Sequence, residues 1–157
     1  MNRIISVFIG LYALTVALLL SYQPVIPSYT PIKHDYRVTA LLTFMQRHNF
    51  SQPYHIDTYI KEADKNQIQP QWLVVISFLE SSGGRRYPLV TNNEWGYGSS
   101  TGLYRFHSVD EGIAYVSNQF AFNKHYAGKP LKQKILTYNS ANPNYYPSFI
   151  NLLNEIK

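Results

Sequence analysis

The stretch WLVVISFLESSGG, residues 72–84, constrains the fold more than any other part of the chain. Pro70 precedes it at a position that suits the first turn of a helix, and the apolar run indicates a buried helix. Four large apolar residues are predicted to share one stripe of that helix: Trp72, Val75, Ile76 and Leu79. The run ends on Glu80, followed at once by two serines and two glycines. An unpaired buried carboxylate is costly, so we expect Glu80 to be exposed, paired or chemically active.

The chain after residue 35 is predicted to be mainly α. Apolar residues recur at helical spacing over further segments, which we expect near residues 36–48, 54–66, 108–124, 130–138 and 147–156. Ser108 and Glu111 have the spacing of a capping box, which marks a helix start. Residues 83–107 contain five glycines and no sustained period, so they predict a long loop or short hairpin region. A loop of this length in a compact domain usually serves a function.

The first 20 residues form a hydrophobic segment that we interpret as a membrane anchor or a signal peptide. Arg3 precedes a predominantly apolar run over residues 4–20. As a helix this run would span about 26 Å, close to a bilayer core of about 30 Å. No convincing small-x-small cleavage site follows, which favours the anchor. Residues 21–35 hold three prolines and predict a semi-rigid linker, so the folded domain should cover residues 36–157.

Charge and composition exclude several classes of function. The net charge of +5 favours anionic partners, but no dense block of Lys and Arg is present, and nucleic-acid binding has no supporting pattern. The chain has no cysteine, which excludes disulfides, thiol catalysis and Cys-based metal sites. The five histidines show no metal-ligand spacing, so we predict no metal site and no cofactor. No nucleophile elbow or phosphate-binding glycine loop occurs.

Most of the nine acidic residues have an ordinary structural explanation. Seven are assigned to a solvated helix face, to a helix first turn or to the ends of the domain: Asp57, Glu62 and Asp64, then Asp110 and Glu111, then Asp35 and Glu155. Glu80 and Glu94 remain. Glu80 ends an apolar helix, and an apolar setting favours the protonated form of a carboxyl group, as a general acid requires. Sequence position alone leaves a solvent-facing helix end as the alternative.

Four segments, in this order, resemble the lysozyme-like superfamily of peptidoglycan-cleaving enzymes. They are FLESSGG at 78–84, NNEWGYG at 92–98, FHSVDEGIAYV at 106–116 and YNSANPNYY at 138–146. The resemblance covers roughly residues 36–157 and is to the bacterial glucosaminidase and lytic transglycosylase domains. It implies a lysozyme-like helical domain that cleaves β-1,4 glycosidic bonds in peptidoglycan glycan strands. The stretch that usually follows the catalytic Glu in lytic transglycosylases is not present here. The loop of the form NN-x-aromatic-G is more similar to the glucosaminidase branch, and the reaction outcome stays open.

The resemblance also implies the residues of the site. Glu80 would be the general acid and base, with Ser81 as its neighbour on the cleft wall. The substrate loop would be formed by Asn93, Trp95, Gly96 and Tyr97. Tyr138 and Asn139 would lie beside Glu80, with Tyr138 in hydrogen-bonding reach of Glu80 or the substrate. Glu94 is the one other acid in the loop and a possible second carboxylate, although the family pattern fixes no acid at this position.

Three functions stay open on the sequence alone. The first is glycan cleavage, by hydrolysis or by transglycosylation to an anhydro-muramic product. The second is a non-catalytic peptidoglycan-binding module on the same fold. The third is a small anchored protein that acts on lipid or another protein through its basic surface. With an anchor, the domain would face the periplasm or exterior from the cytoplasmic membrane; with a cleaved leader it would be secreted.

Overall fold

The computed structural model describes residues 35–86, 91–99 and 101–157. Its α-helices are α2 (Tyr36–Arg47), α3 (Ile56–Asn66), α4 (Pro70–Ser81), α5 (Val109–Phe122), α6 (Leu131–Tyr138) and α7 (Tyr145–Leu153). A 3₁₀ turn, η1 (Pro53–His55), precedes α3. Two short strands, β1 (Gly98–Ser99) and β2 (Gly102–Leu103), pair antiparallel with Gly98 opposite Leu103. The mainly helical class is confirmed, and a hairpin does lie within the long loop region.

The predicted N-terminal segment, residues 1–20, and all but the last residue of the predicted linker lie outside the described residues. Among the residues that are described, no helix combines the length and the apolar character needed to cross a bilayer.

The helix starts follow from local hydrogen bonds that the sequence supplies. The Asp35 side chain accepts from the backbone N–H of Arg37 at 2.9 Å and so caps α2. Ser108 Oγ accepts from the N–H of Glu111 at 3.1 Å, as the capping-box pattern predicts for α5. The Glu111 carboxylate accepts from the N–H of His107, one residue before the cap. Each cap satisfies amide groups that have no partner within the helix.

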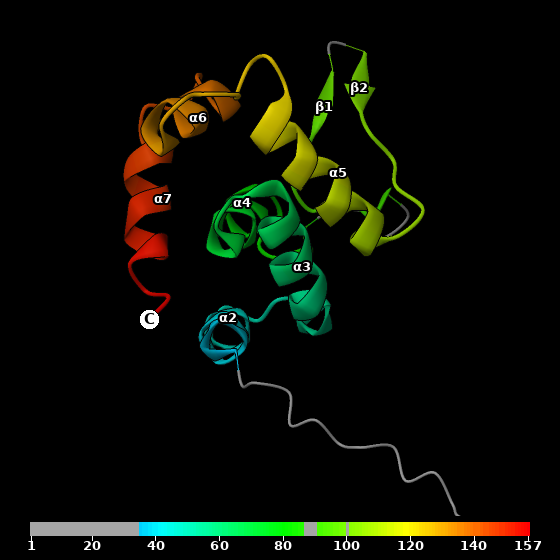
Figure 1. Cartoon of the computed structure of the whole chain (residues 1–157), viewed down its shortest axis with the longest axis vertical. Coiled ribbons are helices and arrows are strands. Elements are labelled where there is room, and N and C mark those ends of the chain that lie inside the picture. Colours follow the sequence, from blue (N-terminus) through cyan, green and yellow to red (C-terminus); the bar gives the residue numbers. More distant parts are fainter. Residues whose placement is uncertain (1–34, 87–90, 100) are drawn as a thin grey trace, which may run out of the picture. The chain divides into compact units, whose positions relative to one another are not determined.

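Helix α4 is the central helix of the domain. Figure 1 shows it between α3 and α5 on one side and α7 on the other, and α4 contacts all three. Residues 73–77 are therefore all buried, which a one-sided stripe does not predict. Trp72 and Leu79, two members of the predicted stripe, are only half-buried. All four residues of the predicted stripe lie in the core or pack against it, but burial extends beyond the stripe because α4 is covered on more than one face.

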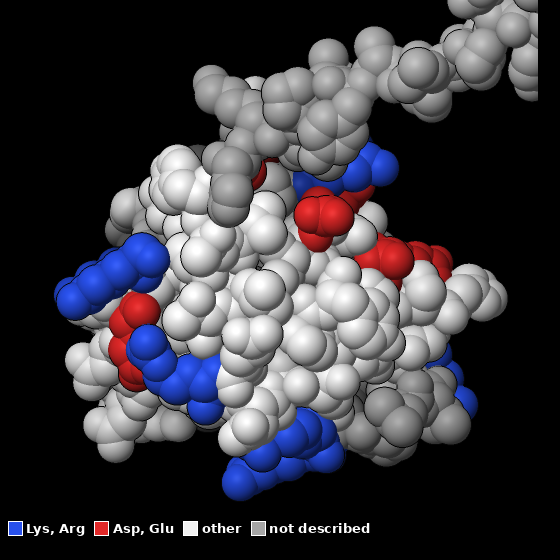
Figure 2. All heavy atoms as spheres, turned by 90° about the horizontal axis from the view of Figure 1, so that it is seen from below, with Lys and Arg blue, Asp and Glu red and all other residues white. Residues whose placement is uncertain are grey.

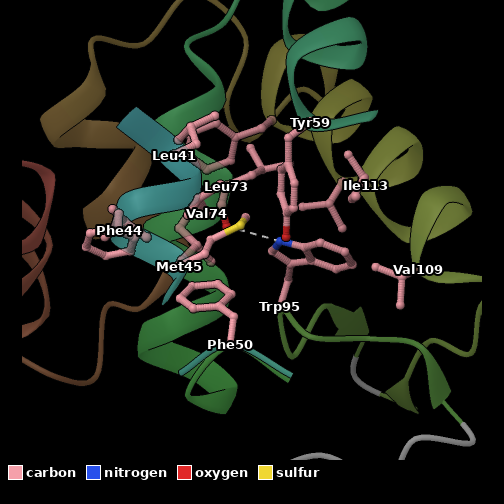
Figure 3. Close-up of a cluster of buried hydrophobic side chains, with 14 of the residues drawn as sticks. Leu41, Phe44, Met45, Phe50, Tyr59, Leu73, Val74, Trp95, Val109 and Ile113 are labelled. Atoms are coloured by element: carbon pink, nitrogen blue, oxygen red, sulfur yellow. Dashed lines mark hydrogen bonds between the residues drawn. The ribbon is translucent and has the colours of Figure 1, made fainter. Parts of the chain in front are cut away.

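Trp95 attaches the long loop to the core. Its side chain is fully buried, and its indole Nε1 donates to the backbone oxygen of Leu73 in α4 at 3.2 Å (Figure 3). On the other side it packs against α5, where a Cβ added to Gly112 would lie 2.5 Å from the indole ring. Gly112 thus allows the close approach of helix and tryptophan. The loop that carries the sequence's NNEWG segment is held between two helices.

Two predictions about surface and boundaries were wrong. Glu62 is buried rather than solvated, and it pairs with Lys65 at 3.2 Å. The reason is that α3 contacts α2, α4 and α5, so most of its circumference is covered. Helix α7 begins at Tyr145, two residues before the predicted start at Pro147. Proline is tolerated there because amide groups in the first helical turn need no intrahelical acceptor.

Helices α2 and α3 are also joined by an ion pair at the surface. Arg37 donates to Asp64 at 2.5 Å and to Asp35 at 2.7 Å, and the guanidinium lowers the pKa of Asp64 below its usual value. Figure 2 shows that charged side chains on the face seen from below lie mostly at its periphery, around a broad uncharged area. Because the ion pair between Arg37 and Asp64 is solvent-exposed, its contribution to the free energy of unfolding is small.

Candidate active site

Glu80 lies in the last turn of α4, where its half-buried carboxylate meets α7. Tyr145, the first residue of α7, donates its hydroxyl to Glu80 Oε1 at 2.6 Å. A hydrogen bond of this length to a carboxylate is stronger than one between neutral groups. Burial, followed by the negative charge of Glu80, raises the pKa of Tyr145 far above its ordinary value, so the hydroxyl remains a donor at any physiological pH. Glu80 is therefore oriented by a fixed partner.

Tyr138 connects this pair to the long loop. Its ring stacks on that of Tyr145, with centroids 6.4 Å apart, and its hydroxyl donates to the backbone oxygen of Trp95. Burial raises the pKa of Tyr138 well above its ordinary value, and the charges of Tyr145 and Glu80 add to the effect. Tyr138 thus lies close to Glu80 but is hydrogen-bonded to the loop. The expected partner role near Glu80 belongs to Tyr145 instead.

A pocket of about 440 Å³ lies beside Tyr138. Its walls come from the loop with the hairpin, from the segment after α5 and from the end of α6: Gly96, Tyr97, Gly98, Ser99, Leu103, His125, Tyr126, Thr137 and Tyr138. Glu80 is not part of the lining, and Tyr138 is the residue that both borders the pocket and lies next to the Glu80–Tyr145 pair. Tyrosine faces in such walls suit the apolar faces of sugar rings.

Asn93 gives the loop its shape. Its amide Nδ2 donates to the backbone oxygens of Tyr97 at 2.8 Å and Tyr104 at 2.9 Å, and its Oδ1 accepts from the N–H of Tyr97 at 3.0 Å. These bonds place the Tyr97 ring parallel to that of Tyr104, at a centroid distance of 5.8 Å. Burial raises the pKa of Tyr97 to about 12, so its pocket-lining hydroxyl stays neutral.

The Ser81 side chain faces the interior rather than a cleft. It is fully buried, donates to the backbone oxygen of Ser77 at 3.0 Å and accepts from the N–H of Gly84 at 2.8 Å. The predicted place of Ser81 on the cleft wall is therefore wrong. Its hydroxyl instead closes the turn that ends α4, and so holds the segment immediately after Glu80.

Glu94 is a buried carboxyl group behind that same turn. Ser77 Oγ donates to Glu94 Oε2 at 3.0 Å, whereas Oε1 has no hydrogen-bond partner among the described residues. Gly84 comes so close that an added Cβ would lie 2.5 Å from Oε1. Burial raises the pKa of Glu94, and the Ser77 hydrogen bond and the charge of His55 only partly oppose the rise. Its role as a second carboxylate stays a prediction, and its burial favours a neutral structural group.

The raised pKa of Glu94 predicts a pH-dependent stability. A carboxyl group whose pKa is higher in the folded state stabilises the fold at low pH, and this contribution is lost as the pH rises through the folded-state value. We expect Glu94→Gln, which is neutral at every pH, to remove this loss. Urea unfolding measured from mildly acidic to alkaline pH should show the wild type losing stability relative to the variant. Asp57→Asn, which alters an exposed acid, should keep the wild-type pH dependence.

Five of the predicted site residues form two groups in the structure. Gly96, Tyr97 and Tyr138 line the pocket, whereas Asn93 and Trp95 are buried and support it from behind. Asn139 is half-buried, and its side chain accepts from the N–H of Asn142 at 3.3 Å, so it shapes the turn before α7. Tyr145 was missed, although it lies within the YNSANPNYY segment. Tyr126 and His125 were also missed, and no local pattern marks them.

No group of His, Cys, Asp and Glu among the described residues has the arrangement of a metal site. Comparison with known proteins found no significant match: no family model, no curated protein and no solved structure matches the chain.

Proposed function

We propose that the chain cleaves the glycan strands of peptidoglycan at a β-1,4 glycosidic bond, on a lysozyme-like fold, with Glu80 as general acid and base. The observation that carries the proposal is the half-buried Glu80, held by the Tyr145 hydroxyl at 2.6 Å. The carboxyl group ends an apolar helix and lies next to Tyr138, which lines a tyrosine-rich pocket. These features support a general acid that acts next to a bound sugar chain.

The reaction would proceed in two proton transfers at one carboxyl group. Glu80 gives its proton to the glycosidic oxygen while the bond to the anomeric carbon breaks, and positive charge develops on the sugar. The resulting carboxylate then accepts a proton from the group that attacks the anomeric carbon. If that group is water, the reaction is a hydrolysis. If it is a hydroxyl of the same sugar, an anhydro-muramic end forms.

The envelope location belongs to the same proposal. Peptidoglycan lies outside the cytoplasmic membrane, and the hydrophobic residues 1–20 would either anchor the domain there or direct its secretion. The linker of residues 21–35 would space the domain from the membrane. Apart from Asp35, both segments lie outside the described residues.

Dye release from labelled, purified cell walls tests the proposal. The purified protein should release soluble dye in proportion to time and protein concentration. Protein that sediments with the walls and releases no dye would identify a binding module instead. Protein that does neither would exclude peptidoglycan as its substrate.

Tyr145→Phe should slow cleavage without removing it. The substitution deletes only the hydroxyl that fixes Glu80, and a hydrogen bond to a charged group is worth about 1.5–3 kcal/mol, so we expect kcat to fall roughly tenfold or more. KM should change little because Tyr145 does not line the pocket. Tyr146→Phe is the matched control, since Tyr146 faces Lys132 rather than Glu80. Equal rates for the two variants would contradict the positioning role.

A further inference from the structure

The segments that form the wall of the pocket opposite the hairpin contain lysines and no acidic residues. From Gly112 to Asn154 the sequence contains no Asp or Glu, while it contains four lysines: Lys124, Lys129, Lys132 and Lys134. This stretch includes most of α5, all of α6 and all of α7. One acid from another segment, Glu80 of α4, lies next to Tyr138 of this wall. Among the described residues, Glu80 forms no ion pair with any of the four lysines.

Lys129 is a cation that contacts a residue of the pocket lining. Its Nζ donates at 3.1 Å to Thr137 Oγ1, and Thr137 lines the pocket. An ammonium group has three donors, and this bond uses one of them. Among the described residues, no ion pair includes Lys129. His125, an exposed residue on the same wall, adds a second nitrogen-bearing group to the lining.

Lys134 stabilises the backbone of the segment that forms this wall. Its buried Nζ donates to the backbone oxygens of Phe120 at 2.6 Å and Tyr126 at 2.8 Å, which ties the pocket-lining Tyr126 to the end of α5. Burial lowers the pKa of Lys134, and the positive charge of Lys129 lowers it further. The two amines therefore lie close enough to repel each other. An anion bound at Lys129 would relieve that repulsion.

We propose that Lys129 and His125 form a subsite for a carboxylate carried by the substrate, namely the carboxyl groups of the peptides attached to the glycan strand. The proposal rests on the proposed function and specifies it: the protein distinguishes peptide-bearing strands from bare sugar chains. The pocket is bordered by Tyr97 on the hairpin side and by Tyr126, Tyr138 and His125 on the other, where Lys129 is bonded to Thr137. A sugar ring suits the tyrosine faces on both sides, and a carboxylate attached to that sugar suits Lys129 and His125. An uncharged sugar oligomer makes only the first kind of contact.

The test measures binding of the full chain carrying Glu80→Gln, so that the ligand is not consumed. The ligands are soluble peptidoglycan strands with free peptide carboxylates and the same strands after conversion of those groups to neutral amides. We expect amidation to weaken binding about fivefold, the upper range for a partly exposed ion pair. Lys129→Gln should weaken binding of strands with free carboxylates by the same factor as amidation does. When the Lys129→Gln variant is tested with amidated strands, the loss of affinity should be no larger than for either change alone. The difference should vanish near 1 M salt, where screening acts over about 3 Å.

Lys61→Gln is the matched control, because Lys61 is an exposed lysine of α3 that does not line the pocket. It should bind both ligands as the parent does. Equal binding to free and amidated strands would overturn the subsite and leave the proposed function intact, since dye release measures cleavage separately. The subsite is also overturned if Lys129→Gln weakens binding to phosphatidylglycerol vesicles and not to the strands. That result would assign Lys129 and His125 to the binding of lipid phosphate.

Discussion

Glu80→Gln should reduce the rate of peptidoglycan cleavage by about 10²–10⁴-fold, the usual contribution of a general acid or base. Glutamine keeps the size of the side chain and an oxygen that can accept from the Tyr145 hydroxyl, so the contact between α4 and α7 persists. It cannot donate a proton to the glycosidic oxygen. We therefore expect a folded protein that binds its substrate and does not cleave it. Initial rates of dye release, together with urea unfolding, measure the two effects separately.

Glu155→Gln provides the matched comparison. It removes the same charge from a residue that pairs with His48 at 2.9 Å and does not line the tyrosine pocket. This variant should cleave at the wild-type rate. If Glu80→Gln and Glu155→Gln retain equal activity, Glu80 is not the acid, and the assignment of the site fails.

Trp95→Ala should produce the largest loss of stability of any single substitution discussed for this protein. A fully buried Trp replaced by Ala costs about 3–5 kcal/mol, from lost burial and from the cavity that remains. Trp95 is fully buried and donates to Leu73 (Figure 3). Its indole ring also lies against Gly112 of α5. Its backbone oxygen also accepts from Tyr138. The substitution should therefore disturb the pocket as well as the core, and urea unfolding followed by fluorescence or circular dichroism measures the loss.

Trp72→Ala is the control that shows whether the loss of stability depends on the position of Trp95 or occurs for any Trp replaced by Ala. Trp72 is only half-buried, and its buried Nε1 has no hydrogen-bond partner among the described residues. Removing it relieves an unsatisfied donor, so the free energy of unfolding should fall by clearly less than for Trp95→Ala. Similar losses for both variants would contradict the view that Trp95 joins the loop to the core.

The sequence predicted the elements whose signals are local. Pro70, the apolar run and the two glycines place α4 and its end, and the spacing of Ser108 and Glu111 places the start of α5. Glu80 could be singled out because few acids lack a structural explanation. The physical basis is the same in each case: a helix start, a helix end or a costly charge depends on neighbours within a few residues.

Contacts between distant segments could not be predicted in the same way. The Tyr145 hydroxyl reaches Glu80 across 65 positions of sequence, and it does so because α7 packs on α4. The burial of Glu62 likewise depends on which helices surround α3. Ser81 follows Glu80 directly and yet faces the interior, because it lies one helical turn after the buried Ser77. The pattern of residue types along the sequence does not determine which helices pack against one another.

Mass spectrometry of peptidoglycan incubated with the wild-type protein tests the central claim most directly. We expect new glycan ends of one kind, with the attached peptides intact: reducing glucosamine or reducing muramic acid for hydrolysis, or anhydro-muramic acid for transglycosylation. The same digest with Glu80→Gln should contain none of them. Glycan strands that stay uncut in the wild-type digest, or fragments that arise only from cleaved peptide or amide bonds, would contradict the proposal.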